Sequence, residues 1–268
     1  MDRILDLDRY PLDAADSSEY RDLVAARRQD LATHGMFNLN GFARPEAVAR
    51  CVAEIAPLFE TAAYTHKRAH NIYFDDDIAD LAPDHPALRR LQTTNRTLCA
   101  DRIPDSMVTR VYEWPPLAAF LAATMGMPRL YPMADPLARV NVMAYGEGEA
   151  LNWHFDRAEF TTTLLLQAPE SGGAFQYRRD LRAEGAPNYA GVERLLAGAD
   201  EAVRTLPLAP GTLSVFKGKY TAHRVTPPEG PRPRIVAVFS YYERPGVAFD
   251  AAERRGFYGR AEALDGAG

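Results

Sequence analysis

The chain has 268 residues, of which 47% are hydrophobic and 25% charged, and its formal net charge is −5. This composition is typical of a globular protein with a sizeable core, and it excludes a strongly basic nucleic-acid-binding surface. No apolar run reaches the ~20 residues of a membrane-spanning helix. The acidic start MDRILDLDRYPLD has no apolar signal segment. The two cysteines, Cys51 and Cys99, form no metal motif or disulfide framework. We therefore expect free thiols, a cytoplasmic location and neither nucleic-acid nor membrane partners.

The first part of the chain, residues 1–130, is expected to be mostly helical. Residues 17–34 predict a helix that begins after a capping serine and ends before a glycine. Residues 44–64 repeat apolar side chains at helical spacing, and Pro57 is expected to kink that helix. Residues 114–126 begin with two prolines and end with a glycine, which again indicates a helix.

A polar, mixed segment at 66–105 interrupts this pattern. It fits a wall or lid over a pocket, and it fits a long surface connection equally well. Its run of aspartates, Asp75 to Asp77, is typical of a solvated turn, although it would also suit a basic substrate.

From about residue 131 the sequence becomes rich in strand-like runs separated by Gly and Pro. The runs lie at 137–145, 151–156, 160–167, 173–179, 202–208, 211–218, 221–227 and 234–243, with one helical insert at 188–200. Many short strands with such turns predict a sandwich, barrel or jelly roll. We expect a single domain, 1–268, in which 1–130 gives helical support and a pocket wall. The catalytic core is expected at 131–245, with a C-terminal tail, 246–268, closing the pocket.

Three residues in the β-rich part have the chemistry of a metal site. His154 and Asp156 lie two residues apart, so their side chains share one face of a strand. His223 follows 67 positions after Asp156. Two imidazoles and one carboxylate form the facial triad of non-heme Fe(II) oxygenases, which leaves positions on the metal free. His154, Asp156 and His223 are therefore the candidate metal-binding and catalytic residues.

Arg234 begins a strand that we expect to run antiparallel to the strand of His223. A guanidinium there is suited to bind the distal carboxylate of 2-oxoglutarate in a bidentate manner. Arg232 has the same strand parity, although its position after Pro231 favours an exposed turn.

The ordered set HFD, HRV and RPR resembles the Fe(II)/2-oxoglutarate-dependent dioxygenase superfamily, over roughly residues 137–244. The surrounding text, NWHFDRAEFTTTLLLQ and HRVTPPEGPRPRIVAVFSYYERPG, is similar to the branch of free-amino-acid halogenases and their hydroxylase relatives. The resemblance implies a double-stranded β-helix, or jelly roll, mainly β with α, supported by the N-terminal helices. It also implies Fe(II), 2-oxoglutarate and O2 as cofactor and co-substrates.

The same resemblance makes Asp156 decisive for the reaction. The halogenases of this branch lack the metal-binding carboxylate, and a small residue there leaves room for chloride. Because this chain has Asp156, we expect hydroxylation of an unactivated C–H bond, with release of succinate and CO2. The expected substrate is a free amino acid, for which the lysine-modifying relatives suggest a basic one.

Five further residues are candidates for binding. Tyr145 and Asn141 precede the metal strand and would contact 2-oxoglutarate, although packing or turn roles fit them as well. Arg96 would bind the substrate carboxylate, Ser240 shares the face of Arg234, and Tyr258 would close the pocket from the C-terminal tail.

Two other functions stay open at this point. An oxygenase of a carrier-tethered or peptidyl residue would need an open groove, and a non-enzymatic cupin-like binder would leave Arg234 without a purpose. The sequence does not define the oligomeric state.

Overall fold

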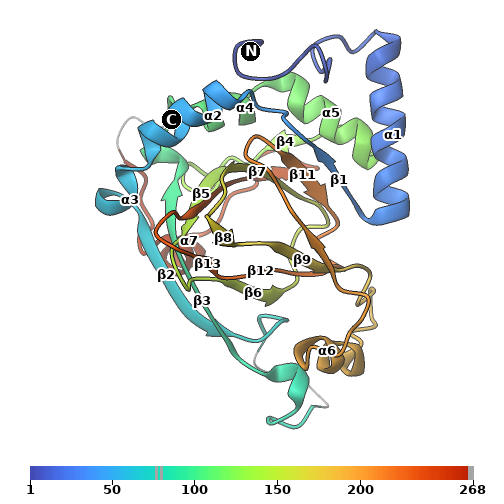
Figure 1. Cartoon of the computed structure of the whole chain (residues 1–268), viewed down its shortest axis with the longest axis vertical. Helices are drawn as coiled ribbons and strands as arrows, with labels where there is room; N and C mark the ends of the chain where they lie inside the picture. The colour runs from blue at the N-terminus through green and yellow to red at the C-terminus, as the bar shows by residue number, and fades with distance from the viewer. Residues whose placement is uncertain (76–77, 79–80, 265–268) are drawn as a thin grey trace.

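The structure is a computed structural model, and it describes residues 1–75, 78 and 81–264 (Figure 1). Two antiparallel sheets face each other. The large sheet contains, in order, β1 (Met36–Leu39), β11 (Leu213–Phe216), β7 (Thr161–Gln167), β14 (Arg234–Phe239), β5 (Val140–Tyr145), β3 (Leu91–Cys99) and β2 (Tyr64–His70). The small sheet contains β10 (Arg204–Leu206), β9 (Phe175–Arg178), β12 (Ala222–Val225) and β6 (Leu151–His154). Two short pairs complete the strands, namely β13 (Pro228–Glu229) with β8 (Ser171–Gly172) and β15 (Tyr241–Tyr242) with β4 (Tyr131–Pro132). The jelly roll expected for a β-rich chain is confirmed.

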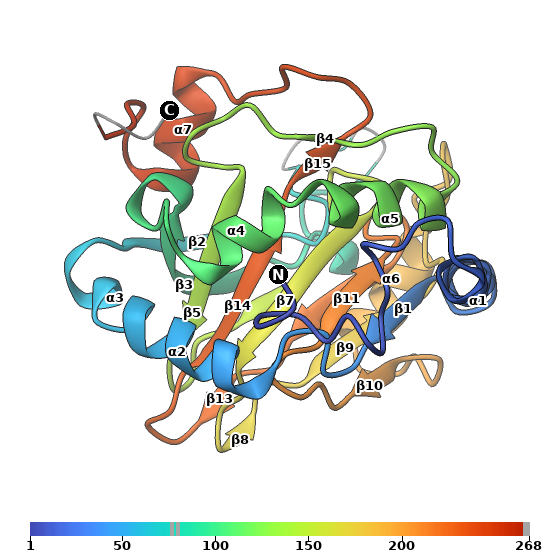
Figure 2. The same cartoon turned by 90° about the horizontal axis from the view of Figure 1, so that it is seen from above.

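Helices cover the outer face of the large sheet. The α-helices are α1 (Ser18–His34), α2 (Pro45–Ile55), α3 (Leu58–Thr61), α4 (Met107–Tyr112), α5 (Pro115–Met125), α6 (Tyr189–Leu196) and α7 (Ala251–Tyr258), and the 3-10 helices are η1 (Pro86–Leu88) and η2 (Ala100–Arg102). Figure 2 shows α1, α2, α4 and α5 lying over that sheet, and the largest hydrophobic cluster joins the two layers. The inner face of the sheet is thereby left for a cavity.

The predicted helix ends are explained by local chemistry. The side chain of Ser17 accepts a hydrogen bond from Tyr20 N at the start of α1, and Gly35 ends the helix with φ of 72°. The predicted helix at 44–64 is shorter than expected. It divides into α2 and α3 at Pro57, and residues from Tyr64 onward form β2.

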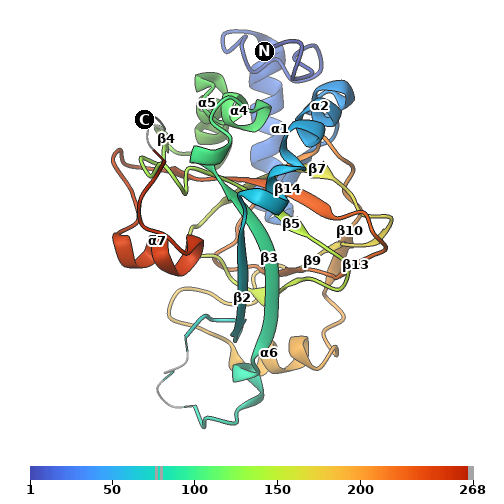
Figure 3. The same ribbon diagram turned by 90° about the vertical axis from the view of Figure 1, so that its left-hand side faces the viewer.

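The expectation of a mostly helical first half missed two long strands in the segment 66–105. β2 and β3 pair along their lengths, and β3 also pairs with β5, so these two strands belong to one wall of the sandwich (Figure 3). Along β2, exposed residues alternate with half-buried ones such as His66 and Arg68. Because the inward side chains are polar, the apolar alternation that marks an ordinary strand is absent. Asp76 and Asp77 lie outside the described residues.

The arrangement of β14 also differs from the expectation. β14 pairs with β5 and β7 in the large sheet, whereas β12 pairs with β6 and β9 in the small one. Arg234 and His223 therefore come from opposing sheets and not from neighbouring strands. Among the described residues, no helix is long and apolar enough to cross a membrane.

Candidate metal centre and co-substrate site

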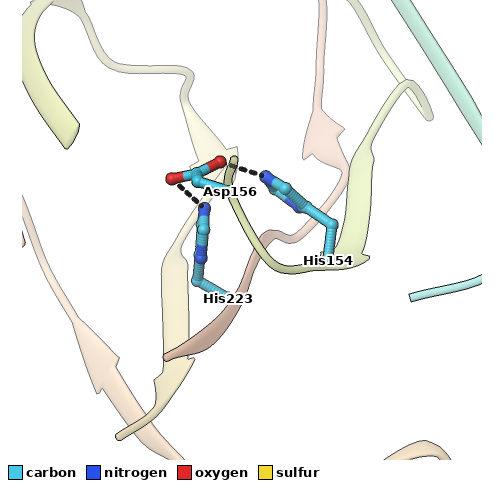
Figure 4. A group of neighbouring side chains, drawn as sticks. All are labelled: His154, Asp156 and His223. Carbon is cyan, nitrogen blue, oxygen red and sulfur yellow. Dashed lines mark ion pairs between the residues drawn. The ribbon is translucent and has the colours of Figure 1, made fainter. Parts of the chain in front are cut away.

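The three predicted ligands meet between the sheets. His154 ends β6, and its cross-strand partner on β12 is His223. Asp156 follows β6 by two residues and lies between the two rings, with Oδ1 3.4 Å from Nε2 of His154 and Oδ2 3.4 Å from Nε2 of His223 (Figure 4). One ligand atom from each residue lies within 4.8 Å of the others. The side chains converge as a single tridentate site.

Both imidazoles are oriented by their backbone. Nδ1 of His154 is 2.8 Å from the carbonyl oxygen of Asn152, and Nδ1 of His223 is 2.9 Å from that of Thr221. A carbonyl only accepts hydrogen bonds, so each Nδ1 donates and each Nε2 keeps its lone pair in the neutral ring. In the neutral ring this hydrogen bond selects the tautomer suited to metal binding, whereas a protonated ring donates from Nε2 to Asp156.

Electrostatics keep the carboxylate ionised. Burial alone would raise the pKa of Asp156, but the charge of His223 and the hydrogen bonds of both histidines outweigh it and hold that pKa well below its usual value. Burial and the neighbouring His223 lower the pKa of His154, whereas Asp156 outweighs burial and raises the pKa of His223. Thr161 Oγ1 donates to Oδ2 of Asp156 at 2.5 Å and holds the carboxylate in place.

This donor set fits Fe(II). Two imidazole nitrogens and one carboxylate, with the opposite side facing a cavity, match the open facial triad that Fe(II) oxygenases use. The triad lines a cavity of about 460 Å³ between the sheets, large enough for a co-substrate and a small molecule together.

Arg234 lies in the wall of the same cavity. It is 5% exposed and pairs across the sheet with Tyr145. In the described part of the chain no carboxylate pairs with Arg234, and burial lowers its pKa to about 10. A buried guanidinium without a counter-charge favours binding of an anion, because the anion replaces the solvation that the side chain has lost. Tyr145 lines the cavity beside it.

The other predicted binding residues do not line the cavity. Asn141 donates to the carbonyls of Leu137 and Val140 and accepts a hydrogen bond from Tyr258, so both side chains are engaged in packing the C-terminal tail. Arg96 points to the outer face of the sheet and pairs with Glu60 at 2.7 Å.

Ser240 is likewise absent from the cavity wall, although it has the parity of Arg234. Its backbone carbonyl accepts a hydrogen bond from Tyr112, and its N–H donates to the carbonyl of Arg139. Arg232 is exposed and donates to the carbonyl of Pro169. Strand parity therefore identified the correct face, but not how far the cavity extends along it.

Sequence reasoning missed several residues that do line the cavity, among them Arg68, Phe74 and Phe257. Arg68 comes from β2, a strand that the sequence did not reveal, and Phe257 comes from α7 beside the predicted Tyr258. Phe257 belongs to the tail that was expected to close the pocket, and that closure stays a prediction. The only signal in the sequence for these residues was that basic residues such as Arg68 lie next to the aromatic residues of HNIYF, at 70–74.

With this geometry established, comparisons with known proteins become informative. A family model described as halogenase D matches residues 20–253. The chain belongs to the halogenase D family. The match spans the helical layer and both sheets, so it covers every residue of the triad and Arg234. This membership confirms the predicted branch and the prediction that the chain is an enzyme. A search of curated proteins gives no match.

Solved structures share the fold of this halogenase D family member. The alpha ketoglutarate dependent carbocyclase SnoK from nogalamycin biosynthesis is 14% identical, with a TM-score of 0.56 and coverage of 90% of this chain and 93% of SnoK. AviO1 from Streptomyces viridochromogenes Tue57 is 17% identical, with a TM-score of 0.55 and coverage of 83% and 96%.

A prolyl-4-hydroxylase from Pseudomonas putida is also 17% identical, with a TM-score of 0.52 and coverage of 83% of this chain and 100% of that one. These similarities show that the fold is that of the 2-oxoglutarate- and Fe(II)-dependent oxygenases, as predicted. The expected cofactors, Fe(II) and 2-oxoglutarate, agree with this fold and with the triad.

Proposed function

We propose that this halogenase D family member is an Fe(II)- and 2-oxoglutarate-dependent hydroxylase of a small molecule, of which a free amino acid is the class that the resemblance favours. The observation that carries this proposal is the position of Asp156 between His154 and His223, at 3.4 Å from each. On a bound metal, this carboxylate would take the place that a halide needs.

His154, Asp156 and His223 would hold Fe(II), and Arg234 would bind the distal carboxylate of 2-oxoglutarate. When bound, the iron supplies the redox chemistry by which 2-oxoglutarate, O2 and a C–H bond become succinate, CO2 and an alcohol. The chain itself positions these groups and excludes water. Aromatic and aliphatic side chains close most of the wall, including Phe175, Phe216 and Val236.

The test is succinate formation by purified protein given Fe(II), 2-oxoglutarate and O2. We expect His223→Ala to abolish Fe(II)-dependent 2-oxoglutarate consumption, because two ligands do not retain the metal in a productive geometry. His34→Ala is the matched control, because His34 is an exposed residue at the end of α1. Undiminished turnover by His223→Ala would contradict the assignment of the triad as the metal site.

The reaction type is tested separately by product analysis. Amino acids are incubated with the complete system in the presence of chloride, and products are examined by mass spectrometry. We expect products that gain one oxygen atom and none that gain chlorine. A chlorinated product made with Asp156 intact contradicts the assignment as a hydroxylase.

A further inference from the structure

Arg68 is a cation in the cavity wall that neither the metal nor 2-oxoglutarate requires. It lies on β2 and faces the cavity that the triad residues also line. Its Nε atom is buried and has no hydrogen-bond partner, and among residues 1–75, 78 and 81–264 no carboxylate pairs with it. Burial and the nearby charge of Arg157 both lower the pKa of Arg68. Such a side chain is stabilised when an anion enters the cavity.

Two phenylalanines fix the position of this guanidinium. Cζ of Arg68 lies 4.5 Å from the ring centroid of Phe74 and 5.8 Å from that of Phe257. The ring of Phe74 is in turn 5.8 Å from the ring of His154, so Phe74 links Arg68 to the metal centre. A small molecule that contacts Arg68 is therefore within reach of the triad.

The backbone conformation of Phe74 supports a role for this residue in a ligand site. Phe74 has φ of 55°, in the left-handed region that bulky residues rarely adopt. It is also one of the two large hydrophobic residues that are exposed among those described. Local strain of this kind concentrates at ligand sites, where the surrounding structure holds it in place.

The remaining described residues of the cavity wall offer no carboxylate to a cationic substrate side chain. Asp156 is the only carboxylate among the described lining residues, and it is a candidate metal ligand. His70 donates from Nδ1 to the carbonyl of Asn71 and accepts at Nε2 from Thr93, so both ring nitrogens are engaged and the ring is neutral. Among the described lining residues, no carboxylate is thus left for an ammonium group at the end of a substrate side chain, whereas the buried, unpartnered Oγ of Ser214 is an acceptor for the α-ammonium group of an amino acid.

We propose that Arg68 binds the carboxylate of a substrate whose side chain is uncharged and apolar, so that the substrate class is an apolar amino acid and not a basic one. This inference rests on the proposed function, since it assigns the substrate of the same metal centre. Arg68 is its specificity-determining residue, and Phe74 and Phe257 orient the guanidinium. The side chain of the substrate then points toward the triad along the apolar wall.

The test compares three probes of similar shape. L-norleucine has a carboxylate and an apolar side chain, L-lysine adds a terminal ammonium group, and L-norleucinamide lacks the carboxylate. Binding of each is measured without O2 to the full chain loaded with Fe(II) and saturating 2-oxoglutarate, by the change in visible absorbance and by thermal shift. We expect L-norleucine to bind about tenfold or more tightly than either other probe, as loss of one charge-assisted interaction implies.

Variants assign that preference to Arg68. Arg68→Met keeps an unbranched apolar stem beside the two rings but should lose the preference for L-norleucine over its amide, and Arg68→Lys should retain part of it. Arg96→Met is the matched control, because that arginine lies on the outer face of the neighbouring strand. This variant should prefer L-norleucine over its amide as strongly as the wild-type protein does.

The results distinguish a failure of the substrate assignment from a failure of the proposed function. If the wild-type protein does not bind 2-oxoglutarate with Fe(II), the proposed function itself fails. If it does, the inference is overturned when L-lysine or the amide binds as tightly as L-norleucine, when L-norleucine does not bind, or when Arg68→Met keeps the wild-type preference.

Discussion

Gly218 and Asp156 are so close that only glycine fits at position 218. A β-carbon on Gly218 would lie 2.8 Å from both Cβ and Cγ of Asp156, and closer still to its Oδ2 atom. The backbone carbonyl of Gly218 also accepts a hydrogen bond from Asp156 N at 3.1 Å. The loop after β11 therefore contacts both the backbone and the side chain of Asp156.

We predict that Gly218→Ala weakens metal binding, because the new methyl group displaces the Asp156 carboxylate. Loss of such supporting geometry reduces metal affinity about 10- to 100-fold, which an anaerobic titration with Fe(II) measures. Gly256→Ala is the matched control, since Gly256 lies in α7 with open space around it. It should leave metal affinity unchanged and raise the free energy of unfolding by about 0.5–1 kcal/mol through helix propensity. Equal metal affinity in both variants would contradict the role of Gly218.

Thr161 supports the same carboxylate through its hydroxyl group, at 2.5 Å from Oδ2 of Asp156. Thr161→Val keeps the shape but removes this donor, so we expect metal affinity to fall by about tenfold, corresponding to one hydrogen bond to a charged group. The same metal titration measures the effect. Thr162→Val serves as the control, because its side chain points to the opposite face of β7. The prediction fails if the two variants bind the metal equally well.

Arg234 is predicted to determine the affinity for 2-oxoglutarate. Arg234→Met removes the buried cation that faces the cavity, and we expect the KM for 2-oxoglutarate to rise about 30-fold or more, corresponding to roughly 2 kcal/mol. Arg232→Met tests the alternative arginine, which is exposed and bonded to the carbonyl of Pro169. It should leave that KM unchanged, and a larger effect at Arg232 than at Arg234 would reverse the assignment.

The two cysteines are predicted to be unreactive in the folded protein. Both are buried and unpaired, and burial raises the pKa of Cys51 to about 11 and that of Cys99 to about 12. A raised thiol pKa reduces the thiolate fraction, so at about pH 8 few thiolates are present and access is blocked. We expect a thiol reagent to label neither residue in the native protein and both after denaturation. Rapid labelling of the native protein would show that these sites open.

The strands of the catalytic core were predictable because their sequence carries the signal locally. In β7 and β14, β-branched and apolar residues run between turn residues, and these strands lie where the pattern placed them. β2 gave no such signal, because its inward side chains His66, Arg68 and His70 face a cavity and the opposing wall. A strand that lines a polar site lacks the alternation by which strands are recognised.

The same contrast explains the outcome for the site residues. His154 and Asp156 share a face by their spacing alone, and the chemistry of imidazole and carboxylate identified His223 as their partner. Arg96 was a less successful candidate, because a residue on β3 points either to the cavity or to the helical layer, and sequence parity cannot assign the face without the pairing of β3 with β5.

The sequence by itself identified the candidate ligand set and the candidate arginine for the co-substrate, and it predicted the jelly roll, because these depend on side-chain chemistry and on the period of a strand. The tertiary structure alone decided which residues line the cavity beside the triad. Arg68, Phe74 and Phe257 come from segments almost 190 positions apart, and they meet because β2 and α7 pack beside the triad. Local sequence patterns do not predict contacts between such distant residues, because sheet pairing and burial between distant segments bring these residues together.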